Sequence, residues 1–142
     1  MKKILIMGLP GSGKTTLAQE LQKQLQNSGK KVAWFNADTV RKQFSDWDFS
    51  EEGRIRQATR MKMLCAGSET EFNICDFVCP LVEMRDILNP DVVIWMDTIK
   101  EGRFEDTNRV FVPPDKCDFR ITSKDCEHSA KVIIEVMNWS QV

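Results

Sequence analysis

A glycine-rich octapeptide near the start of the chain constrains the fold more than any other sequence feature. Its sequence, Gly8-Leu9-Pro10-Gly11-Ser12-Gly13-Lys14-Thr15, fits the pattern G-x-x-x-x-G-K-[ST] in full. It follows the apolar residues 3–7 and precedes residues 14–28, where leucines recur at helical spacing. A strand before the pattern and a helix after it are the context in which such a loop wraps a phosphate. We therefore expect a strand, a phosphate-binding loop and a helix in this order.

Each part of this loop suits the phosphates of a nucleoside triphosphate such as ATP. Glycines let backbone N–H groups point inward and approach a phosphate closely, and the N-terminus of the following helix adds positive potential. Lys14 is expected to contact the β and γ phosphates, and the Thr15 hydroxyl to coordinate Mg²⁺. A glycine turn that binds nothing is the alternative, which the full match disfavours. The expected ATP-binding residues are Gly8, Pro10, Gly11, Ser12, Gly13, Lys14, Thr15 and Thr16.

Strand-like and helical segments alternate along the whole chain. This alternation predicts an α/β fold whose mostly parallel sheet is flanked by helices. We expect five strands, at residues 3–7, 31–36, 71–78, 91–97 and 119–122, the last of them at an edge. We expect helices at residues 14–28, 38–44, 51–67, 81–88 and 124–139. Residues 98–118 show no periodicity and predict a long loop, which in a compact domain is usually functional.

Length and charge limit the classes of function that the chain can have. Its 142 residues suit a single domain, residues 1–142. The 20 basic and 21 acidic side chains leave a net charge of -1, which gives no general attraction to nucleic acid or to a membrane surface. No apolar run approaches the roughly 18 residues of a membrane-spanning helix. The first apolar run, Ile4 to Met7, leads directly into the glycine loop and does not resemble a secretory signal, so a cytoplasmic protein is expected.

The cysteines predict thiols rather than disulfides or metal ligands. They contain no C-x-x-C pair and are scattered through the sequence at Cys65, Cys75, Cys79, Cys117 and Cys126. An odd number without a secretory signal is typical of reduced cysteines in the cytoplasm. Cys75 and Cys79 with the single His128 could suggest a metal site, but their spacing fits buried apolar cysteines better.

A second set of motifs begins after the second expected strand and covers most of the remaining chain. It comprises Asn36-Ala37-Asp38 with Arg41, Asp48-Phe49-Ser50 with Arg54, Gln57 and Arg60, Val78-Cys79-Pro80, and Ile99-Lys100 with Phe104. In this order, from Lys2 to about Ile121, the sequence resembles the adenylylsulfate kinases. In that family the motifs read D-G-D-x-x-R, G-F-S-x-x-x-R-x-x-N-x-R-R, I-S-P and I-K-x-F-T-G-I-D. The resemblance implies the three-layer fold of a P-loop kinase, which would transfer the γ-phosphoryl group of ATP to the 3′-hydroxyl of adenosine 5′-phosphosulfate and give 3′-phosphoadenylylsulfate.

The resemblance also implies roles for individual residues. Lys14 and Asp38 would be catalytic, with Asp38 orienting or deprotonating the acceptor hydroxyl, and Thr15 and Asp38 would hold Mg²⁺. Arginines suit the phosphosulfate group and phenylalanines suit the adenine ring. The implied substrate-binding residues are Asp38, Arg41, Phe49, Arg54, Gln57, Val78, Cys79, Lys100 and Phe104.

Each of these roles has a structural alternative in the sequence. Asp38 could simply cap the next helix, and the arginines could be solvated helix residues. Phe49 and Phe104 could anchor their loops in the core. The sequence leaves both a ligand-binding role and a structural role open for these residues.

The chain departs from the family at two places that bear on the chemistry. Asn36 stands where the family has its first aspartate, and it can form hydrogen bonds but cannot act as a base. The basic lid segment P-L-x-x-C-x-x-R-D-x-K-G-L-Y-K-K-A-R is missing after Thr98. Lys100, Arg103 or Arg109 either replace its charges or belong to a solvated loop.

Three functions are therefore considered. The first is an adenylylsulfate kinase that uses ATP and Mg²⁺. The second is a P-loop kinase that acts on another nucleoside, nucleotide or polynucleotide end, and the third is a nucleotide-binding module without turnover. The expected partner is a small-molecule substrate rather than a nucleic acid or a membrane. The resembled family commonly forms dimers, so a homodimer is the assembly that the resemblance implies.

Overall fold

The computed structural model of the chain describes residues 1–102 and 104–141, which contain one five-stranded sheet. The strands are β1 (Lys2–Met7), β2 (Val32–Asn36), β3 (Phe72–Asp76), β4 (Val92–Met96) and β5 (Phe119–Ile121). Their order across the sheet is β2-β3-β1-β4-β5, and neighbouring strands pair in parallel throughout. The expected α/β fold is confirmed, with β5 at an edge, and the sheet is parallel throughout rather than mostly parallel.

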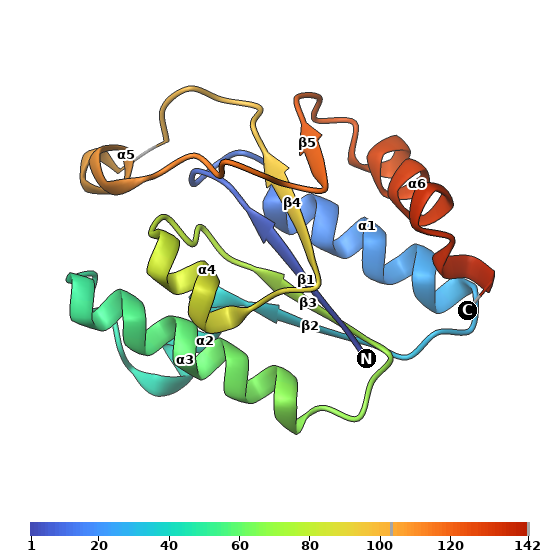
Figure 1. Cartoon of the computed structure of the whole chain (residues 1–142), viewed down its shortest axis with the longest axis horizontal. Helices are drawn as coiled ribbons and strands as arrows, with labels where there is room; N and C mark the ends of the chain where they lie inside the picture. Colours follow the sequence, from blue (N-terminus) through green and yellow to red (C-terminus); the bar gives the residue numbers. More distant parts are fainter. Residues whose placement is uncertain (103, 142) are drawn as a thin grey trace.

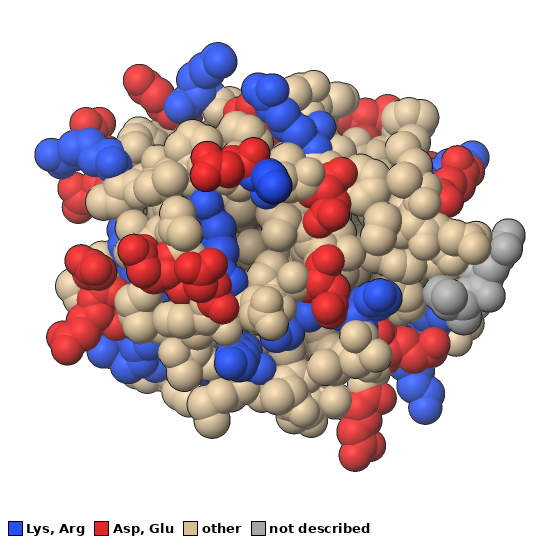
Figure 2. All heavy atoms as spheres, viewed as in Figure 1, with Lys and Arg blue, Asp and Glu red and all other residues tan. Residues whose placement is uncertain are grey.

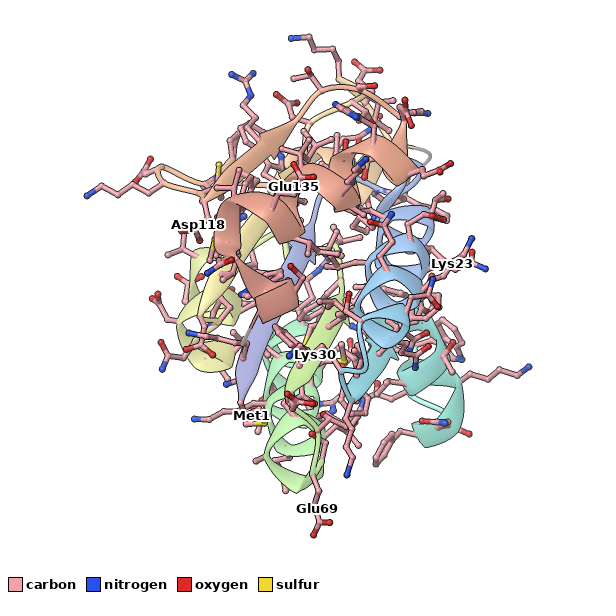
Figure 3. All side chains as sticks on the ribbon, turned by 90° about the vertical axis from the view of Figure 1, so that its right-hand side faces the viewer. Met1, Lys23, Lys30, Glu69, Asp118 and Glu135 are labelled. Atoms are coloured by element: carbon pink, nitrogen blue, oxygen red, sulfur yellow. The ribbon has the colours of Figure 1, made fainter. Side chains whose placement is uncertain are left out.

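Helices cover both faces of this sheet, so that the molecule has three layers (Figure 1). On one face α1 (Lys14–Asn27) and α6 (Cys126–Met137) lie side by side, as Figure 3 also shows, with the exposed Lys23 and Glu135 on them. The other face is covered by α2 (Ala37–Phe44), α3 (Glu51–Gly67) and α4 (Val82–Leu88). Two short helices, α5 (Glu105–Val110) and the 3-10 helix η1 (Trp139–Gln141), complete the elements of the described residues.

Alternating side chains of the central strand β1 divide the core into two layers. Ile4 and Ile6 pack with α1 and α6, whereas Leu5 and Met7 pack with α3 and α4. The leucine stripe that the spacing predicted on α1 is fully buried in the first layer. Burial of each such side chain stabilises the fold by roughly 1.5–3 kcal/mol. Because β1 is held on both faces and both edges, the glycine loop that follows it starts from a rigid point at the carboxyl edge of the sheet.

The segment between β4 and β5 differs from the expected loop because it contains the short helix α5. Five of the six residues of this helix are not buried, and only Thr107 is, so the sequence carries no apolar period that could have indicated it. The expectation of an unstructured loop over residues 98–118 was therefore wrong in part. Arg103, one of the residues considered as a substitute for the lid charges, lies outside the described residues.

All five cysteines are free thiols. Cys75 and Cys79 belong to the core layer under α3 and α4, whereas His128 is exposed on α6, over the opposite face. Within residues 1–102 and 104–141, no group of three or more His, Cys, Asp or Glu side chains is arranged to hold a metal ion. None of the helices in this part of the chain is long and apolar enough to cross a membrane.

Candidate active site

The glycine loop turns tightly between β1 and α1. A Cβ on Gly8 would lie 2.7 Å from the carbonyl oxygen of Met96 and 2.8 Å from Ser12 Oγ, so no larger residue fits there without a shift. Gly13 has a φ of 103°, in the left-handed region, and it caps α1 without a side-chain hydrogen bond. The first N–H groups of α1 therefore face the loop without a side-chain cap, which is the arrangement that binds an anion.

Two polar side chains of the loop are buried beneath it. Lys14 is only 9% exposed, and its Nζ donates a hydrogen bond of 3.0 Å to the carbonyl oxygen of Leu9. Ser12 Oγ is buried and has no hydrogen-bond partner among the described residues. A buried polar group normally has a partner, so this hydroxyl is consistent with a loop that is built around a ligand.

A buried carboxylate, Asp76 at the end of β3, joins the loop to the end of β2. Thr15 Oγ1 donates a hydrogen bond of 2.8 Å to Asp76 Oδ2, and Asn36 Nδ2 donates another of 2.8 Å to the same oxygen. Burial raises the pKa of Asp76, while the hydrogen bonds from Thr15 and Asn36 and the positive charge of Lys14 oppose this rise. Asp76 was not among the site residues expected from the sequence. The sequence does show that Asp76 ends an apolar strand. However, only the strand order brings Asp76 to Thr15 and Asn36.

Asn36, and not Asp38, is the N-cap of α2. Asn36 Oδ1 accepts a hydrogen bond of 3.0 Å from the Thr39 backbone N–H. The alternative reading of Asp38 as the cap was therefore wrong. Asp38 lies in the first turn of α2, where its carboxylate is exposed and lines the cavity described below. This position leaves Asp38 available to a ligand, next to the end of β2.

Two buried arginines support the segment between α2 and α3. Arg41 is 4% exposed and donates from Nη1 to the carbonyl oxygens of Asp46, at 3.0 Å, and Asp48, at 3.1 Å. Arg54 is 6% exposed and donates from Nε to the carbonyl oxygen of Phe49 at 2.8 Å. The ring of Phe49 lies 4.3 Å from the guanidinium carbon of Arg41 and 5.5 Å from that of Arg54. Burial lowers the pKa of both arginines, but guanidinium groups remain charged in proteins.

These elements surround a cavity of about 710 Å³, a size that suits small-molecule ligands. Figure 2 shows the face of Figure 1 with Lys and Arg side chains inside a hollow. The expected site residues that line the cavity are Pro10, Gly11, Gly13, Lys14, Thr15, Thr16, Asp38, Arg41, Phe49, Arg54, Val78, Cys79 and Phe104. Residues that line it and were not expected include Asn36, Trp47, Asp76, Asp106 and Thr107. The fold thus brings the two sets of motifs together in one cavity.

Two expected substrate residues lie outside the cavity. Gln57 is fully buried: its Nε2 donates to the carbonyl oxygen of Ala37 at 3.0 Å, and its Oε1 accepts from Arg60 at 2.8 Å. The bond to Ala37 joins α3 to α2, so Gln57 stabilises the packing of these two helices. Lys100 is exposed and does not line the cavity. The exposed Arg109 pairs with Asp106 at 3.1 Å on its own helix, which favours the reading of a solvated charge.

The segment after β4 packs against the glycine loop. Thr98 Oγ1 donates a hydrogen bond of 2.6 Å to the carbonyl oxygen of Ser12. A Cβ on Gly102 would lie 3.0 Å from Pro10 Cδ and 3.1 Å from the Pro10 carbonyl oxygen. The segment that replaces the family's basic lid thus reaches the phosphate-binding loop directly.

A parallel sheet of order β2-β3-β1-β4-β5, with a phosphate-binding loop after β1 and a second binding region after β2, defines a P-loop kinase fold. A family model described as adenylylsulphate kinase matches residues 2–102 of the sequence. The chain therefore belongs to the adenylylsulfate kinase family.

Similar proteins in both sequence and structure agree with this family. A probable adenylyl-sulfate kinase of Aeropyrum pernix is 33% identical over 88 residues, which cover 60% of this chain and 48% of that protein. The adenylyl-sulfate kinase of Clostridium kluyveri is 34% identical over 86 residues, which cover 58% of this chain and 43% of that protein. The matched part of the chain thus spans about half the length of these relatives or less.

Solved structures show the same fold. The Mycobacterium tuberculosis APS kinase CysC, in complex with AMPPNP and APS, has a TM-score of 0.79 at 18% identity, covering 96% of this chain and 97% of that one. A shikimate kinase from Acinetobacter baumannii, in complex with shikimate, has a TM-score of 0.65 at 16% identity, covering 100% and 96%. At these identities the likeness concerns the fold, and substrates must be argued from the site.

Proposed function

We propose that this chain is an ATP-dependent adenylylsulfate kinase, which transfers the γ-phosphoryl group of ATP to the 3′-hydroxyl of adenosine 5′-phosphosulfate. The observation that carries the proposal is a single cavity that joins the glycine loop to two buried arginines and the ring of Phe49. One part of this cavity suits a triphosphate, and the other suits an anionic nucleotide. The family membership supports the same pairing of ligands.

In this proposal the glycine loop binds the phosphates of ATP through its backbone N–H groups. Lys14 leaves its bond to Leu9 and contacts the transferred phosphoryl group, whose charge it stabilises. Asp38 accepts the proton of the acceptor hydroxyl or orients that hydroxyl toward the phosphorus atom. Both side chains line the cavity, so the transfer would take place between them.

The acceptor would occupy the part of the cavity beneath the segment between α2 and α3. Arg41 and Arg54 supply two buried positive charges, which suit the phosphosulfate group. Phe49 and Phe104 are 50% and 58% exposed and line the cavity, so their rings are available to stack on the adenine. Val78 and Cys79 also line the cavity. Gln57 and Lys100 are not part of this proposal.

Oxygen atoms from α1, α2 and the end of β3 suit a magnesium ion. Thr15 and Asp76 provide a hydroxyl and a carboxylate, and Asp38 provides a second carboxylate lining the cavity. Mg²⁺ prefers such oxygens and is usually held by one or two carboxylates together with substrate phosphates. When bound, it would neutralise phosphate charge. We therefore propose ATP and Mg²⁺ as the cofactors.

Three further parts of the proposal concern the whole protein. Residues 1–142 would form one domain, which a single cooperative unfolding transition would indicate. Because the family commonly forms dimers, we propose a homodimer, which light scattering in solution would detect. The free cysteines suit a reducing compartment such as the cytoplasm.

The experiment that tests the proposal measures ADP release with a panel of acceptors in the presence of ATP and Mg²⁺. We expect rapid release with adenylylsulfate and little with AMP, adenosine or an oligonucleotide 5′ end. A clear preference for another nucleotide would support the second candidate, a kinase with a different acceptor, which the absence of the family's basic lid segment after Thr98 favours. No acceptor-dependent ADP from any member of the panel would overturn the kinase function and leave a nucleotide-binding module.

A further inference from the structure

We propose that Asp76 supplies the carboxylate on which magnesium binding at Thr15 depends, in place of an aspartate at position 36. The family motif D-G-D has its first carboxylate at the end of the second strand, where this chain has Asn36. In the structure, a carboxylate occupies the adjacent position on the neighbouring strand instead. The inference rests on the proposed function only in that ATP is the nucleotide.

The two residues are direct neighbours across the sheet. Asn36 ends β2 and Asp76 ends β3, and the two are register partners in the parallel pairing of these strands. Their side chains meet, because Asn36 Nδ2 donates to Asp76 Oδ2 at 2.8 Å. Both side chains also reach Thr15 Oγ1, Asp76 at 2.8 Å and Asn36 at 3.3 Å. A carboxylate at either position would therefore lie beside the same hydroxyl of the glycine loop.

The side chain of Asn36 is suited to a partner carboxylate at position 76. Its Oδ1 accepts from the Thr39 N–H as the cap of α2, which leaves Nδ2 to donate to Asp76. An aspartate introduced at position 36 could still cap the helix, but it could not donate a hydrogen bond. Two carboxylates would then face each other at a distance of about 3 Å, which disfavours the ionised pair. The amide at position 36 is therefore compatible with an ionised carboxylate at position 76, whereas a second carboxylate at position 36 would oppose it.

The hydrogen bond from Thr15 explains how Asp76 acts on the metal. A threonine hydroxyl has one proton and two lone pairs. Thr15 gives its proton to Asp76, and Asn36 Nδ2 donates to one lone pair of Oγ1 at 3.3 Å, so the other lone pair is left to a metal ion. In other P-loop proteins a carboxylate and the loop Ser or Thr hold Mg²⁺ together. Asp76 is only 2% exposed, and buried charges in proteins are usually hydrogen-bonded, paired or bound to a metal ion.

The test measures binding of AMPPNP, a non-hydrolysable ATP analogue, by calorimetry with and without Mg²⁺. For the unmodified chain we expect Mg²⁺ to strengthen binding. For Asp76→Asn we expect this magnesium effect to fall by about tenfold or more, while binding without Mg²⁺ stays within about twofold, as for loss of a residue that orients a metal ligand. An Asp76→Asn variant that keeps the full magnesium effect would overturn the inference.

A double variant that exchanges the two side chains, Asn36→Asp with Asp76→Asn, gives the second test. It retains one carboxylate and one amide beside Thr15, so we expect it to recover most of the magnesium effect and to remain folded even if the single variant does not. If the magnesium effect in the double variant is no larger than in Asp76→Asn, the proposal that position 76 replaces position 36 is overturned. Asp86→Asn, an exposed position on α4, is the matched control and should behave as the unmodified chain.

A second readout does not depend on calorimetry or on turnover. Mn²⁺ bound in place of Mg²⁺ gives an electron paramagnetic resonance signal, and we expect its nucleotide-dependent binding to be lost in Asp76→Asn and regained in the double variant. Neither measurement uses an acceptor. A failure of the proposed adenylylsulfate kinase activity would therefore appear in the ADP-release panel alone and not in these data.

Discussion

Asn108 and Gly102 exchange two hydrogen bonds that close the segment between β4 and α5. The backbone N–H of Gly102 donates to Asn108 Oδ1 at 2.7 Å, and Asn108 Nδ2 donates to the carbonyl oxygen of Gly102 at 3.2 Å. Gly102 in turn lies against Pro10 of the glycine loop, where a Cβ would be 3.0 Å from Pro10 Cδ. The side chain of Asn108 thus holds this segment against the phosphate-binding loop.

We predict that Asn108→Ala weakens binding of ATP more than binding of the acceptor. Loss of two hydrogen bonds costs about 1–2 kcal/mol, which corresponds to roughly a fivefold to thirtyfold weaker interaction if the segment covers the bound nucleotide. The measurement is the KM for each substrate in the ADP-release assay. Asn27→Ala, at the exposed end of α1 and away from the cavity, is the control for loss of an asparagine. Equal effects of Asn108→Ala on both substrates would show that the segment does not act on the ATP side.

Lys14→Ala should abolish phosphoryl transfer with little effect on folding. Its Nζ bonds the backbone of the loop and its side chain lines the cavity, so the residue serves the ligand more than the core. Removing one preorganised charge from the reacting phosphoryl group should lower kcat by about 10²- to 10³-fold or more. Lys23→Ala, on the exposed side of α1, should leave kcat unchanged. A Lys14→Ala variant with full activity would refute the assignment.

Phe49→Ala should weaken the acceptor more than ATP. The ring lines the cavity and lies 4.3 Å from the guanidinium carbon of Arg41. Loss of a stacking partner costs about 1 kcal/mol or more, so the KM for adenylylsulfate should rise at least about fivefold. Phe44→Ala is a close control, because that ring is 53% exposed and lies 4.3 Å from Arg60, but outside the cavity. Equal losses for both substrates would argue against stacking.

The features that could be predicted from sequence are those that depend on neighbours along the chain. The glycine loop needs only its own residues and the flanking periodicity, and the stripe of Leu17, Leu21 and Leu25 predicts the buried face of α1. The bounds of α3, Glu51–Gly67, agree with the expected residues, because Ser50 caps its first turn. Strand ends agree with the expected bounds or differ by at most two residues.

The features that were missed depend on contacts between distant segments. Asp76 matters because β3 lies between β2 and β1, which brings it to Asn36 and Thr15, and a linear sequence does not show this order. Gln57 was assigned to the substrate from its place in a motif, but the packing of α3 against α2 buries it. α5 has no apolar stripe, because its buried residue is Thr107, so periodicity could not predict this helix.

Asp46 connects three arginines of α2 and α3, and this arrangement makes the stability of the fold depend on pH. Its carboxylate lies 2.8 Å from Arg56 Nε and 2.9 Å from Arg60 Nη2, and it is 4.0 Å from Arg41 Nη1. Hydrogen bonds from Arg56 and Arg60 hold the pKa of Asp46 well below its ordinary value of 3.8. The folded state therefore binds a proton at this carboxylate less readily than the unfolded state does.

The sign of the effect follows from this difference. A carboxylate with a depressed pKa in the folded state stabilises the fold at pH values above its unfolded pKa and loses that contribution as the pH falls below about 4. We predict that Asp46→Asn lowers the free energy of unfolding at about pH 7, and that the gap to the unmodified chain narrows as the pH is lowered toward about 3. Urea denaturation at a series of pH values measures this gap. Asp86→Asn should show no gap at about pH 7, because Asp86 is exposed on α4 and makes no ion pair among the described residues. A gap for Asp46→Asn that stays constant over this range would mean that the carboxylate acts through its shape rather than through its charge.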